Sequence, residues 1–350
     1  MNGDARQRIK GTISRRKFAG KSVVAVIALG AAGITGYSIL NADKAKIYLN
    51  YHRMGHCAPA VIKSLLDING EDDPDLARFA GGMAGGIAGP DMECGAFTAP
   101  VMFLGFQKGL PEGMDEKIQI IRQVQSYFNE FNRHNGSTIC STIRRKDEDG
   151  CWKAVSGFNK SFLTGLQNTA PPPAGSESSW KMIICAFEEK EFHCAHSTLR
   201  KLEKNIGINR KLYDVSWPYL GGIAMLNRTC GALTAGVMAL SSSLSGIENS
   251  FLKVARMNKM LKEDDRKAMS DETNEFNKAI NAATELGTWF RREFGSAGCY
   301  DICGCNFSRT EDVRKYQSRD YMGRCAGITE KTGDKVTGMI LSSRSSVKSG

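Results

Sequence analysis

The sequence has no Cys-x-x-Cys-His motif, although it holds eleven cysteines in 350 residues. Covalent attachment of a c-type haem uses that motif, so we expect no covalent haem. The close Cys-x-x-Cys pair that is typical of zinc and ferredoxin sites is also missing. Only five histidines are present, and they are scattered along the chain. Any centre in this protein would therefore depend on cysteines that folding brings together.

The chain also lacks a basic stripe with interleaved aromatic residues, which is typical of nucleic-acid binding. Its net charge of +10 is unevenly spread, because residues 1–21 hold seven Lys or Arg and one Asp. That leader accounts for +6 and leaves about +4 for the remainder, so we expect no nucleic-acid partner. With 41% hydrophobic and 24% charged residues, the chain can bury a sizeable core and most simply forms two domains.

The first 45 residues predict an export signal or a membrane anchor. The basic start, which ends in Ser14-Arg15-Arg16-Lys17-Phe18, resembles a twin-arginine signal, and the uncharged run 22–40 is just long enough to cross a bilayer as a helix. The alternative is an ordinary signal peptide or anchor with two coincidental arginines. No Ala-x-Ala cleavage site stands out, so removal and retention both stay open. The positive charge before the run places the remaining chain in the periplasm or on the outer face of the cytoplasmic membrane.

The body of the chain contains two copies of one cysteine pattern. The segment Cys94-Gly95-Ala96-Phe97-Thr98-Ala99 returns as Cys230-Gly231-Ala232-Leu233-Thr234-Ala235. In each copy a cysteine that follows a histidine lies before this segment, 37 residues earlier in the first copy and 36 in the second. Two further cysteines follow each segment. The resulting quartets are Cys57, Cys94, Cys140 and Cys151 in the first copy, and Cys194, Cys230, Cys299 and Cys325 in the second.

Four cysteines from separate helices and loops fit a thiolate-bound centre, because a metal or cluster supplies the charge that buried thiolates need. We expect four glycines to let the backbone approach such a centre closely, namely Gly82, Gly95, Gly222 and Gly231. The alternative is two disulfides per copy, which an exported protein can form. An odd number of cysteines would then leave at least one thiol over.

The second copy carries three additional cysteines. Cys303 and Cys305 follow Cys299 closely, and Cys185 stands just before the first helix of this copy. They could act as substitute ligands, as a redox pair or in a local disulfide, and the sequence leaves these alternatives open.

The hydrophobic pattern of the body is helical. Apolar residues follow Cys57 at steps of four, four and three, which places this cysteine on the apolar side of a helix. We interpret His56, and likewise His193 in the second copy, as a polar residue at a helix start rather than a ligand. Long polar helices are expected over 114–132 and 247–294.

The sequence therefore predicts a mostly α fold with two tandem helical domains, each a small bundle around a four-cysteine site, after an N-terminal signal or anchor helix. The predicted boundaries are 1–45 for the leader, 46–167 for the first domain, 168–180 for a Pro/Ser/Gly linker, 181–330 for the second domain and 331–350 for a flexible tail.

Around the repeated motif, the chain resembles a family described as redox-active proteins with a Cys, Cys-Gly-Ala-x-x-Gly, Cys, Cys arrangement. The resemblance covers nearly all of the chain after the leader, once per half, and is carried by the two quartets and the Gly-Ala pairs. Both copies depart at the last glycine, where this chain has Ala99 and Ala235. A related domain occurs in split-Soret cytochromes, which are dimeric exported proteins that join haems with an iron-sulfur centre. The resemblance implies an iron-sulfur centre here, without the haem.

The resulting hypothesis is an exported electron-transfer protein with one iron-sulfur cluster in each four-cysteine domain. The sequence does not specify the type of cluster. Its partner would be a redox protein in the periplasm or at the membrane, and an oligomer is allowed. Two alternatives remain, which are a thiol-disulfide protein that uses cysteine pairs and a zinc- or disulfide-stapled structural module. Enzyme activity stays open, because the sequence implies no substrate pocket.

Overall fold

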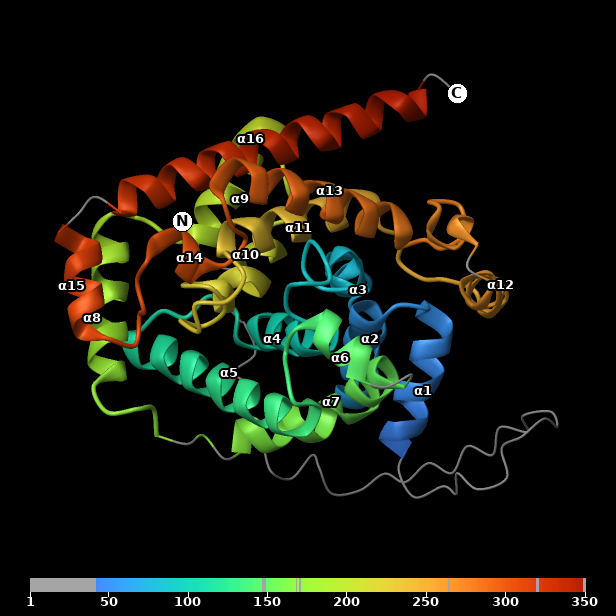
Figure 1. Cartoon of the computed structure of the whole chain (residues 1–350), viewed down its shortest axis with the longest axis horizontal. Coiled ribbons are helices and arrows are strands. Elements are labelled where there is room, and N and C mark those ends of the chain that lie inside the picture. The colour runs from blue at the N-terminus through green and yellow to red at the C-terminus, as the bar shows by residue number, and fades with distance from the viewer. Residues whose placement is uncertain are drawn as a thin grey trace, which may run out of the picture. The chain divides into compact units, whose positions relative to one another are not determined.

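The computed structural model describes residues 42–146, 149–167, 169, 171–263, 265–318 and 321–348. The predicted export signal and the run 22–40 lie outside these residues. Helices dominate the described ranges (Figure 1), and extended pairing within them is limited to two isolated bridges. None of the helices in this part of the chain combines the length and apolar character that a bilayer span requires.

The first cysteine copy is built from seven α-helices and one short 3-10 helix. They are α1 (Ala42–Met54), α2 (Cys57–Asn69), α3 (Pro74–Phe79), η1 (Gly81–Met83), α4 (Gly95–Lys108), α5 (Met114–Asn135), α6 (Cys140–Lys146) and α7 (Gly150–Gln167). Local signals set several ends. Asp73 accepts a hydrogen bond from the Asp75 amide at the start of α3, and Gly136 adopts a left-handed conformation that ends α5.

The second copy repeats this order with insertions. Its elements are α8 (Ser176–Glu189), α9 (Cys194–Ile206), α10 (Lys211–Ser216), η2 (Trp217–Tyr219), α11 (Gly231–Leu244), α12 (Phe251–Lys262), η3 (Arg266–Met269), α13 (Asn277–Phe294), α14 (Cys299–Cys303), α15 (Thr310–Ser318) and α16 (Tyr321–Lys348). In this correspondence α9 matches α2, α11 matches α4, α13 matches α5, α14 matches α6 and α16 matches α7. The inserted elements are α12, η3 and α15.

Three predicted segments differ from the structure. The single helix expected over 247–294 is divided into α12, η3 and α13, because the loop before α13 turns to the first copy, where Asn274 donates to the Met54 carbonyl oxygen over 3.2 Å. The end of the expected linker is helical, since α8 begins at Ser176 and buries Trp180 completely. The expected flexible tail is helical to Lys348, because Val336 and Ile340 pack into the core.

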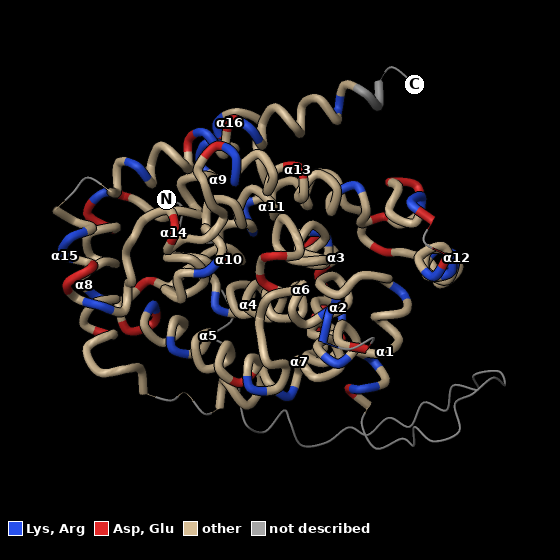
Figure 2. The backbone as a smooth tube through the Cα atoms, in the orientation of Figure 1, with Lys and Arg blue, Asp and Glu red and all other residues tan. Residues whose placement is uncertain are grey.

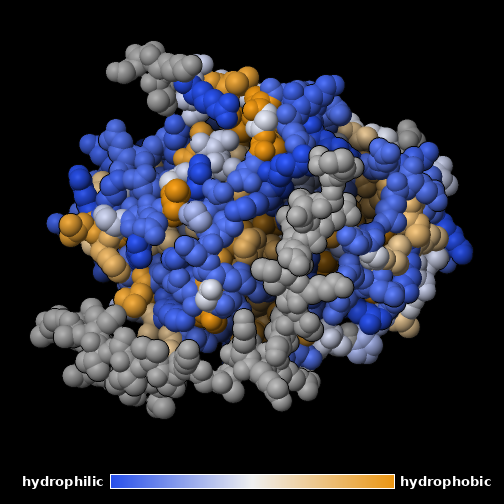
Figure 3. All heavy atoms as spheres, turned by 180° about the vertical axis from the view of Figure 1, so that it is seen from behind, coloured by the Kyte–Doolittle hydropathy of each residue, from blue (hydrophilic) through white to orange (hydrophobic). Residues whose placement is uncertain are grey.

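The two most apolar helices, α4 and α11, form the centre of the fold. Every residue from Gly95 to Gly105 and from Gly231 to Ser241 is buried, and Figure 2 shows charged residues on the helices around them. A helix that is apolar on all sides has to be covered on all sides. One continuous core accordingly contains residues of both copies. On the face shown in Figure 3, hydrophilic residues predominate and apolar ones form separate patches.

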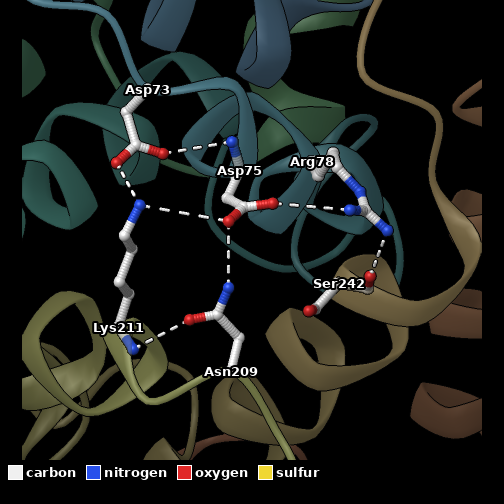
Figure 4. A network of polar contacts seen from close by, with 6 residues as sticks. All are labelled: Asp73, Asp75, Arg78, Asn209, Lys211 and Ser242. Atoms are coloured by element: carbon white, nitrogen blue, oxygen red, sulfur yellow. Dashed lines mark hydrogen bonds and ion pairs between the residues drawn. The ribbon is translucent and has the colours of Figure 1, made fainter.

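The copies pack directly against one another instead of standing apart. In the described part of the chain, α10 packs on α4, and α3 and η1 pack on α11. A polar network crosses this junction (Figure 4), in which Lys211 Nζ lies 2.6 Å from Asp73 Oδ2 and Arg78 Nη2 donates to the Ser242 carbonyl oxygen over 2.7 Å. Asp73 is nearly buried, so Lys211 supplies charge compensation that solvent cannot.

Each long helix also covers the glycine-rich loop of the other copy. Gln125 on α5 donates to the Ala224 carbonyl oxygen over 2.9 Å, and Arg291 on α13 donates to the Ala88 carbonyl oxygen over 3.4 Å. Ala88 and Ala224 are counterparts, each 6 residues before the central cysteine of its copy. Both have the left-handed backbone that favours glycine, with φ of 58° and 48°. The reciprocal contacts hold these loops in a conformation that costs energy locally.

Candidate functional site

The central and third cysteines of each copy are brought together by a short backbone pairing. The Cys94 amide donates to the Thr138 carbonyl oxygen over 2.7 Å, and the Cys140 amide donates to the Met92 carbonyl oxygen over 2.9 Å. The second copy repeats the arrangement, with Cys230 bonded to Ala297 over 2.9 Å and Cys299 bonded to Arg228 over 2.7 Å. The same antiparallel bridge therefore positions two of the four sulfurs in both halves.

Three of the four cysteines in each copy lie at helix starts. In the first copy Cys57 begins α2, Cys94 caps α4 and Cys140 begins α6. In the second copy the same positions are taken by Cys194, Cys230 and Cys299 at α9, α11 and α14. Unpaired amides and the positive end of the helix dipole favour thiolates at such positions.

The glycine after each central cysteine is required by close packing on the first cysteine. A Cβ atom on Gly95 would lie 2.9 Å from Cys57 Sγ, and one on Gly231 would lie 2.4 Å from Cys194 Sγ. These two predicted glycines therefore contact the sites. Gly222 does so as well, because its Cβ would lie 2.6 Å from the Cys299 Cβ.

Gly82 is not part of the first site. A Cβ there would meet Ser241 Oγ at 2.8 Å, so Gly82 is small because it packs on α11 of the other copy. The true counterpart of Gly222 is Gly86, whose Cβ would lie 3.1 Å from the Cys140 Cβ. The separation of 136 residues between the central cysteines, applied to the glycine-rich run, points to Gly86 and was the signal available in the sequence.

Backbone amides also donate to the cysteine sulfurs. Gly85 and Ala58 donate to Cys57, and the matching residues Gly221 and Ala195 donate to Cys194. Burial nevertheless raises the pKa of Cys57 to about 12 and that of Cys194 to about 11. These thiols are therefore neutral at pH 7 unless a positive centre compensates the charge of the thiolate.

The fourth cysteine of each quartet, Cys151 or Cys325, lies near other cysteines of its quartet. Burial is the main cause of the raised pKa of Cys57 and of Cys230, and the nearby Cys151 on α7 and Cys325 on α16 add to it. Burial is the largest cause of the raised pKa of both Cys151 and Cys325. The structure thus gathers each predicted quartet into one region.

Each copy contains one hydrogen-bonded pair of thiols. The Cys94 thiol donates to the Cys140 sulfur, which raises the pKa of Cys94 and lowers that of Cys140. The Cys299 thiol donates to the Cys303 sulfur in the second copy, with the same consequence for that pair. Cys303 thus takes a position beside the third cysteine that no sulfur takes in the first copy.

All eleven cysteines are free thiols. Across the described residues, no three His, Cys, Asp or Glu side chains form a ready metal-ion site. The sulfurs of each quartet therefore lie in one region as thiols, but they are not arranged as a complete set of metal ligands.

The second quartet surrounds a cavity of about 30 Å³. Five thiols line it, and the other lining side chains are mostly apolar or aromatic. The thiols belong to Cys194, Cys230, Cys299, Cys303 and Cys325. A space of this size holds about one water molecule, and the apolar lining offers water few partners.

The other two predicted extra cysteines lie elsewhere. Cys305 is buried but does not line the cavity, and its amide donates to Cys303 Sγ over 3.4 Å. Cys185 is exposed on α8. The structure therefore brings Cys303 alone of the three into the site.

Two side chains near the second quartet were missed by the sequence analysis. The Tyr316 hydroxyl hydrogen-bonds to Cys325, and Arg324 lowers the pKa of Cys303 through its charge. In the first copy Arg144 acts in the same way on Cys140 and Cys151. The arginines could have been noticed from their closeness to cysteines in the sequence, whereas Tyr316 lies on an inserted helix with no counterpart.

The histidines have structural partners. His56 Nε2 lies 2.8 Å from Asn277 Oδ1, and His193 caps α9 by accepting from the His196 amide over 3.2 Å. His193 Nε2 lies 3.1 Å from the Trp217 carbonyl oxygen. Burial lowers the pKa of the imidazoles of His56, His193 and His196, which suits neutral hydrogen-bonding groups.

A duplicated helical scaffold with one cysteine quartet per copy is the class of protein that this fold and these sites define. The family described as "Putative redox-active protein (C_GCAxxG_C_C)" matches residues 55–161 and 192–339, which together exceed half of the chain. The chain belongs to this family, in two tandem copies. No curated protein and no solved structure matches it.

Proposed function

We propose that this protein is an exported electron carrier that binds one iron-sulfur cluster at each cysteine quartet. The observation that carries the proposal is the repetition of an unusual arrangement: four free thiols gathered in one region, three of them at helix starts, with a glycine pressed against the first sulfur. A scaffold that needed only packing could fill these positions with apolar side chains.

The donor set fits such a centre. Iron-sulfur clusters are held by four cysteine thiolates, and each quartet supplies four sulfurs from separate elements. The glycines Gly95 and Gly231 let the helix backbone pack directly against the sulfurs of Cys57 and Cys194. The raised pKa values of the buried thiols mean that a cationic centre would be needed to draw off their protons.

The chain's own residues would bind the cluster and tune it. The cluster supplies one-electron chemistry, and its potential depends on hydrogen bonds to sulfur and on burial. Gly85 and Gly221 donate from the backbone to the first sulfur of each copy, and Tyr316 adds a hydroxyl to Cys325. The apolar lining of the second site would exclude water from it.

Export is supported by the arginine pair and by the apolar run 22–40. A twin-arginine route carries folded proteins, so a cluster assembled in the cytoplasm could be exported in place. The partner would then be a redox protein of the periplasm or of the membrane surface.

A second candidate function is favoured by the hydrogen-bonded thiol pairs. Cys94 with Cys140, or Cys299 with Cys303, could each form a disulfide by giving two electrons and two protons to a protein disulfide. Such a protein would be colourless, and its number of free thiols would change with reductant.

Anaerobic purification followed by visible absorption and analysis of iron, sulfide and zinc separates these functions. The electron-carrier proposal expects colour, iron and sulfide, with Cys94→Ser and Cys230→Ser each removing roughly half of the iron. Cys185→Ser, at an exposed position, serves as the matched control and should keep all of it. Iron that is unchanged in both site variants would end the proposal, and zinc in place of iron would favour a structural module.

A further inference from the structure

The two sites differ at one position that could supply a metal ligand. Cys140 and Cys299 are counterparts, and four residues later the first copy has Arg144 where the second has Cys303. Cys303 is 3% exposed and lines the cavity of the second quartet, whereas Arg144 is exposed. The second site is thus surrounded by five thiols and the first by four.

The local fold explains why Cys303 faces Cys299. The short helix α14 runs from Cys299 to Cys303, so the two residues are four apart and lie on the same side of one turn. Their thiols hydrogen-bond to each other. Gly304 then adopts a left-handed conformation with φ of 60° and ends the helix, which carries Cys305 away from the cavity.

We propose that Cys303 is an exchangeable fifth ligand of the second site, able to replace Cys299 on a bound thiophilic metal centre. The inference rests on the proposed function in so far as both quartets bind such a centre. In the exchange Cys303 releases its proton and donates a sulfur electron pair, while Cys299 leaves the metal and takes up a proton. No electrons are transferred, and the charge of the site is unchanged.

The first site lacks this exchange. Arg144 places a positive charge near Cys140 and Cys151 but offers no electron pair. Loss of Cys140 would therefore leave three sulfurs in the first copy, whereas loss of Cys299 would leave four in the second. The first and second sites of the same chain can therefore be compared directly.

The test uses the full chain and cobalt(II) alone as the probe, under anaerobic conditions. Cobalt bound by thiolates gives a strong charge-transfer absorption that reports thiolate ligation, and bound metal is counted after gel filtration. Cys140→Ser should lose roughly half of this signal, and Cys299→Ser should keep nearly all of it. Cys299→Ser combined with Cys303→Ser should lose roughly half, whereas Cys299→Ser combined with Cys305→Ser should not.

A gain-of-ligand variant keeps the test decisive if a loss variant folds poorly. Arg144→Cys, introduced into Cys140→Ser, should restore the cobalt signal of the first site. Equal losses in Cys299→Ser and Cys140→Ser would overturn the role of Cys303 while leaving the proposed function standing. Full retention in the Cys299→Ser, Cys303→Ser double variant would overturn it as well. A wild-type chain that binds no cobalt would also overturn the role of Cys303, while the iron and sulfide analysis tests the proposed function separately.

Discussion

Substitution of Gly231 by alanine tests whether the close contact between this glycine and the first cysteine is as tight as the structure shows. The added Cβ would lie 2.4 Å from Cys194 Sγ and 2.6 Å from the Tyr219 carbonyl oxygen. Ordinary contacts between such atoms are about 3.5 Å or longer, so the overlap is about 1 Å. Neither neighbour can move easily, because the thiol is at a helix start and the oxygen belongs to the backbone.

The expected cost follows from two opposing effects. Overpacking a buried position destabilises by about 1–3 kcal/mol, and the upper part of that range applies because a backbone atom is involved. Alanine is the better helix former by about 1 kcal/mol, so the net loss in the free energy of unfolding is about 2 kcal/mol. Gly157→Ala is the matched control, since Gly157 lies in α7 with no atom within 4 Å of the new Cβ. That control should stabilise by about 0.5–1 kcal/mol.

Chemical denaturation of both variants and the wild type, followed by circular dichroism, measures the difference directly. A second measurement is the rate at which a thiol reagent modifies the protein, which should rise in Gly231→Ala because the packing around Cys194 is opened. If Gly231→Ala proved as stable as Gly157→Ala, the close approach of this backbone to the thiol would be refuted, and with it the reason for glycine after the central cysteine.

Two further predictions concern the junction between the copies and its pH dependence. Asp73→Ala should lower the free energy of unfolding by about 1–2 kcal/mol, because it removes both the cap of α3 and the partner of Lys211. Asp72→Ala, at the exposed neighbouring position, is the control. In the same denaturation assay it should change the free energy of unfolding by less than about 0.5 kcal/mol. Equal effects would argue against the network in Figure 4. His56 has a folded pKa of about 4, below its ordinary value of 6.5, because of burial, so its contribution to stability is complete above pH 6.5 and is lost as the pH falls toward 4. His56→Gln keeps a hydrogen-bonding group for Asn277 but cannot be protonated, so it should flatten the fall in melting temperature between pH 6.5 and 4. An unchanged slope would contradict the inference that the buried imidazole of His56 is neutral.

The helical fold and the duplication of the cysteine motif could be predicted from the sequence, for a clear physical reason. Helical periodicity is local, and repetition reveals which cysteines are equivalent even though they are far apart in the chain. The same comparison could have corrected Gly82 to Gly86, because the contact made by Gly86 follows from its position relative to Cys94.

The parts that sequence analysis missed depend on contacts between the copies. The breaks around η3 depend on contacts with the first copy, such as the hydrogen bond from Asn274 to the Met54 carbonyl oxygen, and such contacts cannot be read from the sequence of 247–294. The segment 331–348 reads as polar and flexible because few of its residues are apolar. Val336 and Ile340 nevertheless lie one helical turn apart and are both buried in the core, which is enough to order it.

The position of Glu93 has a consequence for the architecture as a whole. Its carboxylate accepts hydrogen bonds from the amide and hydroxyl of Thr229, and these two residues are each other's counterparts, one place before Cys94 and Cys230. In a two-fold symmetric pair of identical chains, a residue that meets its own counterpart lies on the symmetry axis. The chain therefore has the internal geometry of a homodimer whose subunits have been joined into one polypeptide, and two separate copies of a single repeat could associate through this same face.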